Sequence, residues 1–103
     1  MQSFIDLFKR KITLTEERKN HILNRPELLN QESKIKETLN NPELLKKSVS
    51  DERVVIYYKH YPTTPVTSKY LAVVVKISYK ENFIISAYFT DRIKKGDVTW
   101  KKN

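Results

Sequence analysis

The second half of the chain is dominated by three strand-like segments, and this pattern constrains the fold more than any other. Residues 53–61, 69–79 and 83–90 are rich in Val, Ile, Tyr and Phe, which favour β-strands. Short polar connections at 62–65 and 80–82 predict that the three strands form an antiparallel meander. The 103 residues include no cysteine, so no disulfide can stabilise the chain. The strands must therefore supply most of one small hydrophobic core.

The first half of the chain predicts helices. Thr15 can cap the start of a helix that runs to about Asn24. The two glutamates that follow Thr15 favour this helix, because they lie at the positive end of its dipole. Pro26 then disfavours helical geometry at the residue before it. Residues 31–40 predict a second helix with one apolar face.

The remaining segments give weaker patterns. Residues 4–8 and 11–14 are expected to form a short hairpin, although the first of them also suits a helical turn. Asn41 and Pro42 resemble the start of another short helical turn, which would bury Leu44, Leu45 and Val49. Together these patterns predict one α+β domain over residues 1–103, with N-terminal helices packed on a twisted antiparallel β-sheet.

Strand alternation assigns side chains to the two faces of the predicted sheet. We expect one face, including Val73 and Val75, to pack against the helices. The opposite face would then show hydroxyl and amino groups that can contact phosphates, beside aromatic rings that can stack on bases. This face would consist of Tyr57, Lys59, Tyr61, Lys76, Ser86, Tyr88 and Thr90.

Positive charge is concentrated in the same half of the chain. Residues 1–52 hold ten Lys or Arg and nine Asp or Glu, a net of +1, whereas residues 53–103 hold ten and three, a net of +7. This asymmetry suggests a polyanionic partner such as RNA, and it also suits an ordinary basic protein. The sequence contains no long apolar run and no secretory pattern at its start, so a reducing cytoplasm is the expected location.

Few residues could carry catalytic chemistry. Arg18 and His21 adjoin on the first helix at the border of its buried stripe, where a histidine is either a structural residue or a proton-transfer group. Cleavage of RNA without a metal requires a base, an acid and a cation near the phosphate. The chain offers these types in His21, Arg18, Lys59, Tyr57 or Tyr88, and Lys94. Arg92, Lys94 and Lys95 follow the last predicted strand and could hold a phosphate or form a solvated tail.

Several other chemistries lack their sequence signatures. The chain has no cysteine and no histidine pair at helical spacing, so neither a metal site nor a cofactor is expected. It also has no phosphate-binding loop, no Gly-rich dinucleotide fingerprint and no nucleophile elbow. These absences argue against nucleotide hydrolysis and esterase activity.

The order of motifs resembles a known superfamily. The helix pattern Thr15-x-x-Arg18-x-x-His21-Ile22 is followed by Tyr57-Tyr58-Lys59, then by residues 71–76, then by Ser86-Ala87-Tyr88-Phe89-Thr90. Together, over residues 4–100, these motifs resemble the phage-associated branch of the barnase–EndoU–colicin–RelE (BECR) nuclease superfamily.

The resemblance implies a metal-independent ribonuclease of the microbial toxin or effector type. It matches Arg18 and His21 to polar helix positions, and Ser86, Tyr88 and Thr90 to positions on the final strand. Together with the residue types above, it predicts a catalytic site of Arg18, His21, Lys59, Tyr88 and Thr90. The polar sheet face and the basic residues after it predict an RNA-binding surface of Tyr57, Lys76, Ser86, Arg92, Lys94 and Lys95. RNA is the expected partner, with an acidic antitoxin-like inhibitor protein as a second one. The alternatives are a non-catalytic nucleic-acid-binding domain and an interaction module for an acidic protein.

Overall fold

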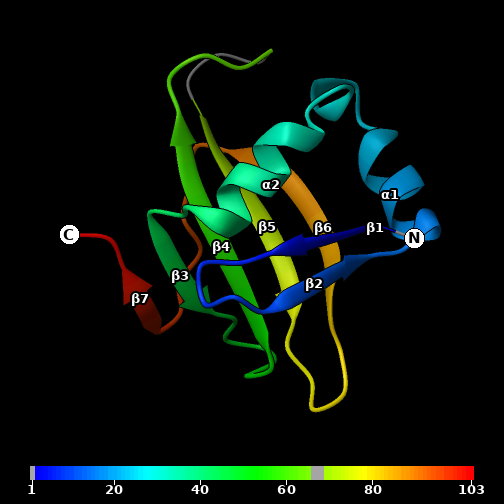
Figure 1. Cartoon of the computed structure of the whole chain (residues 1–103). Helices are drawn as coiled ribbons and strands as arrows, with labels where there is room; N and C mark the ends of the chain where they lie inside the picture. Colours follow the sequence, from blue (N-terminus) through cyan, green and yellow to red (C-terminus); the bar gives the residue numbers. More distant parts are fainter. Residues whose placement is uncertain (1, 66–68) are drawn as a thin grey trace.

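The computed structural model describes residues 2–65 and 69–103. In these ranges the chain forms a small α+β fold with two α-helices, one short 3-10 helix and a seven-stranded mixed sheet (Figure 1). The elements in chain order are β1 (Gln2–Ile5), β2 (Lys11–Leu14), α1 (Glu16–Leu23), η1 (Pro26–Leu28), α2 (Glu32–Asn40), β3 (Leu44–Lys47), β4 (Val54–Tyr61), β5 (Lys69–Lys76), β6 (Asn82–Thr90) and β7 (Val98–Lys101).

The strands lie in the order β1-β2-β6-β5-β4-β3-β7. The predicted meander is confirmed, because β4 pairs antiparallel with β5 and β5 pairs antiparallel with β6. The N-terminal hairpin is also confirmed, as β1 and β2 pair antiparallel, although its first strand is Gln2–Ile5 and not residues 4–8. A parallel contact joins β2 to the start of β6, with Ile12 opposite Asn82 and Thr13 opposite Phe83. The sheet is therefore mixed and not purely antiparallel.

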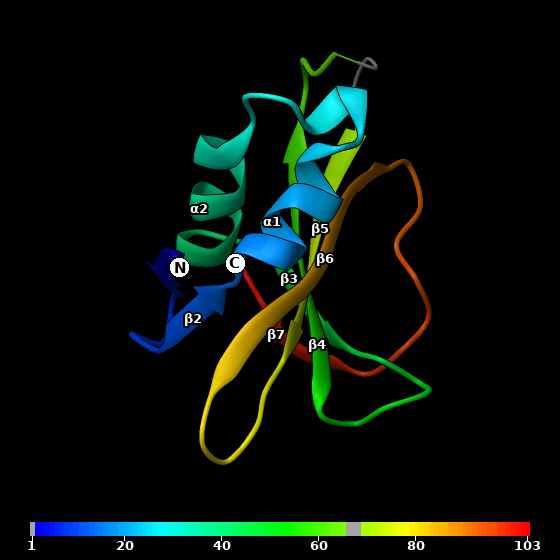
Figure 2. The ribbon, with the colours of Figure 1, turned by 90° about the vertical axis from the view of Figure 1, so that its right-hand side faces the viewer.

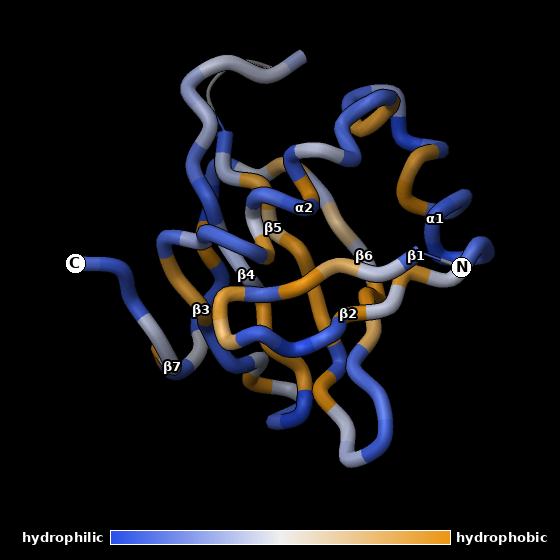
Figure 3. The backbone as a smooth tube through the Cα atoms, viewed as in Figure 1, coloured by the Kyte–Doolittle hydropathy of each residue, from blue (hydrophilic) through white to orange (hydrophobic). Residues whose placement is uncertain are grey.

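The sheet separates two layers. Figure 2 shows α2 and the β1–β2 hairpin on one side of the central strands, and the loop that follows β6 on the other. The main core lies on the helix side, and Figure 3 shows apolar stretches along the central strands that pass beneath the helices. Val73 and Val75 are fully buried there, as predicted. The rest of the main core includes Ile12, Leu14, Ile22, Leu28, Ile35, Leu39, Leu45, Leu71, Ile84 and Ala87.

Both predicted helices are present. Thr15 caps α1, because its hydroxyl oxygen accepts a hydrogen bond of 3.2 Å from the backbone N–H of Arg18. Ile22 is the buried residue of α1, and Ile35, Thr38 and Leu39 are the buried residues of α2. Local capping and apolar spacing thus account for where these helices begin and which face they bury.

The helical turn predicted after Asn41 is wrong. The segment forms β3, and Val49 is 80% exposed. The backbone N–H of Glu43 donates to Tyr58 O in β4, and the N–H of Lys47 donates to Asp97 O, at 2.8 Å each. These hydrogen bonds to distant segments satisfy the backbone better than a short isolated helix could.

The predicted face of β4 is also wrong. Tyr57 and Tyr61 lie in the main core under the helices, whereas Ile56 and Tyr58 face the other side. The phenol groups of Tyr57 and Tyr61 are satisfied inside the core by Asp6 and by Glu37. A bulge in the β5–β6 pairing at Val74 and Val75 further turns Ile84 into the core, against simple alternation.

The two α-helices of the described chain are also too short and too polar to span a lipid bilayer.

Candidate functional site

We call the side of the sheet opposite the helices the outer face. Its buried residues are Ile56, Tyr58 and Ala72, and partly buried residues pack around them: Leu44, Tyr70, Val74, Tyr88 and Ile93. The loop over residues 91–97 passes across this face (Figure 2). The outer face therefore combines aromatic rings from three strands with a loop that carries two lysines and one arginine.

Two cations approach the ring of Tyr88 on β6. The guanidinium carbon of Arg25 lies 5.8 Å from the ring centroid, and the ammonium nitrogen of Lys94 lies 5.6 Å from it. Both distances fall within the range of cation–π attraction. The hydroxyl of Tyr88 is buried and has no hydrogen-bond partner among the described residues. The Tyr88 ring thus contacts one positive group from the helical layer, Arg25, and one from the outer loop, Lys94.

Local backbone geometry positions these two cations. Arg25 follows α1 in an extended conformation, with φ of −80° and ψ of 125°, as expected for a residue before proline. The backbone N–H of Lys94 donates a hydrogen bond of 3.1 Å to the phenol oxygen of Tyr58. Thr90 closes the turn into the loop, since its hydroxyl donates to Arg92 O and accepts from Arg92 N–H.

Tyr58 is held neutral beneath the loop. Burial raises the pKa of its phenol above the ordinary value, the hydrogen bond from Lys94 works in the opposite direction, and nearby Tyr88 adds to the rise. A neutral phenol oxygen can accept the bond from Lys94 across the physiological range. This bond ties the cationic loop to the sheet.

His21 is exposed in the last turn of α1 and is not sealed beneath the helices. Arg18, one turn earlier, is exposed as well. Helix α1 packs against β6, the strand that carries Tyr88. Within residues 2–65 and 69–103, no hydrogen bond or ion pair links Arg18 or His21 side chains to Tyr88 or Thr90. The structure thus brings the helix and the strand together, while their candidate groups stay apart.

The predicted nucleic-acid surface is only partly continuous. Ser86, Tyr88 and Thr90 share the outer face, because they pair with Val74, Ala72 and Tyr70. Arg92, Lys94 and Lys95 are exposed on the adjoining loop. Lys94 and Lys95 line a hollow of about 350 Å³ together with Ser50, Asp51 and Val74.

Three predicted residues do not belong to this surface as expected. Tyr57 is fully buried in the main core, so its placement on an RNA-binding face is wrong. Lys59 shares the side of Tyr57 on β4, and its ammonium group donates to Asn41 O at 3.1 Å. It is therefore separated from Tyr88 by the sheet. Lys76 lies on the outer face, but it forms an ion pair with Asp51.

A buried polar network occupies the helix side. The carboxylate of Asp6 accepts hydrogen bonds from the backbone of Phe8 and Arg10, from Arg10 Nε at 2.9 Å, and from the Tyr57 hydroxyl at 2.6 Å. Arg10 Nη2 donates to the same hydroxyl at 3.0 Å. Burial and Asp6 raise the pKa of Tyr57 well above its ordinary value. The network joins the N-terminal hairpin to β4 and has a structural role.

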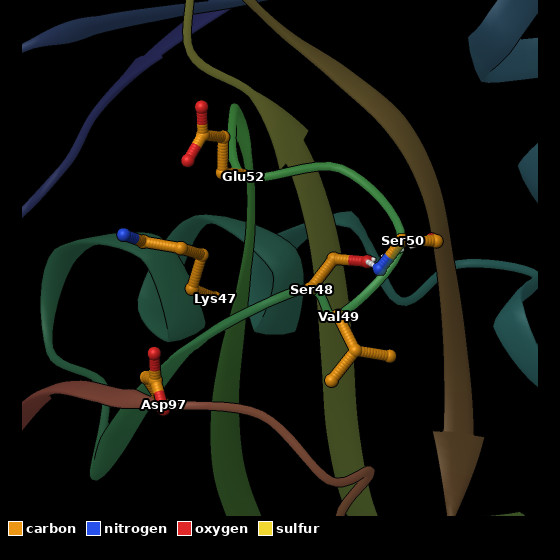
Figure 4. Close-up of a pocket in the computed structure, with 6 residues that line it drawn as sticks. All are labelled: Lys47, Ser48, Val49, Ser50, Glu52 and Asp97. Carbon is orange, nitrogen blue, oxygen red and sulfur yellow. Dashed lines mark hydrogen bonds between the residues drawn. The ribbon is translucent and has the colours of Figure 1, made fainter.

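Two further hollows suit an RNA ligand less well. Figure 4 shows one of about 470 Å³, in which Lys47 lies between the carboxylates of Glu52 and Asp97 in this view. It has more acidic than basic groups and no aromatic ring. The other, of about 500 Å³, lies between β2 and the β5–β6 turn, and its lining includes Lys11 and Lys80. It is basic, but it lies away from the motif residues on β6.

Sequence reasoning missed two residues of the site. Arg25 was visible as a helical-interval neighbour of Arg18 and His21, yet only the fold brings it to Tyr88. Tyr58 lies on the outer face in place of its neighbour Tyr57, because a shift of one residue along β4 exchanges the two faces of the strand. Among the described residues, no three His, Asp or Glu side chains gather as a metal site would require.

Comparison with protein-family models, curated proteins and solved structures finds no match for this chain. Its function must therefore be inferred from the residues of the outer face and of α1.

Proposed function

We propose that this protein is a metal-independent ribonuclease of the toxin or effector type. The observation that carries the proposal is the pair of cations at Tyr88, where Arg25 and Lys94 meet one aromatic ring. Two positive groups beside one ring suit a phosphodiester, which carries one negative charge and gains more in the transition state of cleavage. The resemblance to the BECR superfamily supports the same activity and a fold of that type.

The proposed roles follow from position and chemistry. Arg25 and Lys94 hold the phosphate, and the ring of Tyr88 orients both of them. Because the Tyr88 hydroxyl is buried, we assign Tyr88 a positioning role and not proton transfer. His21 is exposed in the last turn of α1, and imidazole is the side chain that most often transfers protons in enzymes, so we assign His21 as the general acid or base.

The reaction would be an internal transfer at phosphorus. The 2′-oxygen of the ribose loses its proton to a base and forms a bond to phosphorus. The bond from phosphorus to the 5′-oxygen of the next nucleotide breaks, and an acid protonates that oxygen. The products are a 2′,3′-cyclic phosphate and a 5′-hydroxyl end, and the step consumes neither water nor a cofactor.

The direct test is cleavage of labelled RNA in the presence of EDTA. His21→Ala should lower the rate by ~10²–10⁴-fold, the usual contribution of one acid–base group, with RNA affinity nearly unchanged. His21→Gln should not restore the rate, because an amide cannot carry the proton. Asn20→Ala, on the same exposed part of α1, is the matched control and should cleave like the original protein.

Variants of Tyr88 separate its ring from its hydroxyl. Tyr88→Phe should keep most of the activity, whereas Tyr88→Leu should lose it, because only the ring positions Arg25 and Lys94. Full activity of His21→Ala would remove His21 from the mechanism. RNA binding with no cleavage by the original protein would contradict the ribonuclease proposal.

One observation favours a second function, a non-catalytic RNA-binding domain. The outer face presents Tyr70 and Tyr88 beside exposed lysines, which suffices for stacking and phosphate contacts without His21. An acidic antitoxin-like inhibitor would bind the same basic loop. Binding that is equal in the original protein and in His21→Ala, together with no cleavage by either, would support this function.

A further inference from the structure

A pocket on the outer face lies beside the proposed phosphate site. It has a volume of about 370 Å³, within the range of small-ligand sites. Its lining residues come from three segments that are distant in sequence: Glu43, Leu44, Tyr70, Ile93, Val98 and Lys101. We call this the base pocket.

We propose that the base pocket binds one nucleobase of single-stranded RNA and prefers bases that carry an exocyclic amino group. The inference rests on the proposed function, because it names the substrate feature recognised next to the cleaved phosphate. It is carried by the presence of an aromatic ring, apolar walls and a carboxylate in one pocket.

The pocket adjoins the phosphate site through two elements. Ile93 lines the pocket, and the next residue, Lys94, contacts the ring of Tyr88. On the sheet, Tyr70 pairs with Thr90, so Tyr88 is its diagonal neighbour on the same face. Such neighbours are separated by roughly 7–8 Å. One nucleotide can therefore place its base in the pocket and its phosphate near Lys94.

Tyr70 is held in a fixed orientation that suits stacking. Its ring makes edge contacts with Tyr58, at 6.4 Å between centroids and 85° between planes, and with His60, at 5.1 Å and 69°. Three other residues that line the pocket, Leu44, Ile93 and Val98, are apolar. An aromatic ring beside apolar side chains is the usual environment of an unstacked RNA base.

Glu43 supplies the selective group. Its backbone is fixed by hydrogen bonds to Tyr58 O and from Lys102 N–H. One carboxylate oxygen, Oε2, accepts the backbone N–H of His60 at 3.1 Å. In the described part of the chain, no hydrogen bond involves Oε1, so it can accept a proton donor from a ligand.

The chemistry of the bases then predicts the preference. Adenine, cytosine and guanine each carry an amino group that can donate to a carboxylate. Uracil has none, and its only ring N–H lies between two carbonyl oxygens, which a carboxylate repels. The exposed ammonium group of Lys101 at the rim can contact the phosphate of the bound nucleotide.

The test measures binding of short 2′-O-methyl oligonucleotides, which cannot be cleaved. The original protein should bind oligo(C) and oligo(A) about ten-fold more tightly than oligo(U) at one salt concentration, as expected for one hydrogen bond to a charged group. Glu43→Gln should reduce the ratio of these affinities to the affinity for oligo(U) toward one. Tyr70→Leu should weaken binding of all three by about five-fold or more.

Tyr79→Leu is the matched control, because Tyr79 is fully exposed on the β5–β6 turn and lies outside the pocket. It should bind like the original protein. Equal affinity of the original protein for oligo(C) and oligo(U) would overturn the inference. This measurement does not depend on whether any variant folds. So would unchanged affinity of a folded Tyr70→Leu protein.

Failure of this inference is distinguishable from failure of the proposed function. RNA cleavage without base preference would overturn the base pocket and leave the ribonuclease intact. Base preference without cleavage in EDTA would do the reverse and would support the RNA-binding domain.

Discussion

The buried network of Asp6, Arg10 and Tyr57 predicts a large effect from the loss of one oxygen atom. In Tyr57→Phe the ring still fills the core, but the carboxylate of Asp6 loses its 2.6 Å bond to the phenol. Asp6 is only 1% exposed and Tyr57 not at all, so water cannot replace that bond. Arg10 also loses a partner, yet a third of its side chain is exposed and it can bind water instead.

The magnitude follows from this asymmetry. A hydrogen bond to a charged group contributes about 1.5–3 kcal/mol, and here it is removed inside the core. We therefore expect the free energy of unfolding to fall by about 2–3 kcal/mol. For a small protein this corresponds to a decrease of about 0.7–3 M in the urea midpoint.

The assay is urea unfolding at pH 7, followed by circular dichroism. Tyr79→Phe is the control, because that phenol is fully exposed, and its effect should be within about 0.5 kcal/mol. The slope of the unfolding free energy against urea should stay unchanged in both variants. An equal midpoint for Tyr57→Phe and Tyr79→Phe would refute the reasoning and show that the network contributes nothing net.

Three other predictions concern pH, the loop and RNA. Burial raises the pKa of both Tyr57 and Tyr61 in the folded protein. Their contribution to stability is therefore complete below the pKa of an unfolded tyrosine, about 10, and falls as the pH rises above that value. The urea midpoint should decline over this alkaline range, and less steeply in Tyr57→Phe. Gly96 has a φ of 150°, and a side chain there would meet the backbone carbonyl of Lys47. Thermal unfolding should therefore show that Gly96→Ala lowers the stability of the protein by roughly 1–3 kcal/mol, whereas Lys95→Ala should leave it unchanged. Replacing Lys94 and Lys95 with Gln should reduce the slope of log affinity for single-stranded RNA against log salt by ~1.4, and an unchanged slope would place the phosphates elsewhere.

Features with local causes could be predicted from the sequence. Helix α1 begins where Thr15 caps it, and β5 forms where five aliphatic residues follow Tyr70. Neither depends on knowing which distant residue lies nearby. The same is true of the β4–β5–β6 meander, because its connections are short.

Features that depend on distant residues could not be predicted from the sequence. Strand β3 forms because β4 and β7 offer it backbone partners on both sides, and nothing in residues 41–49 reports this. The face of β4 depends on Asp6, which accepts the phenol of Tyr57 and draws it inward. In the candidate site, Tyr88 was identified from its motif, but its contact with Arg25 arises only when α1 packs on β6.

The parallel contact between β2 and β6 affects how the chain must fold during synthesis. Strand β2 emerges early from the ribosome, but its partner residues, Asn82 and Phe83, follow only after both helices and strands β3 to β5 have been made. Strand β3 likewise waits for β7 at residues 98–101. Pairings across such sequence separations form slowly, because the loop entropy is lost before the contact is gained. The folded outer face, and any activity that depends on it, can thus form only after the residues of β7 have been made.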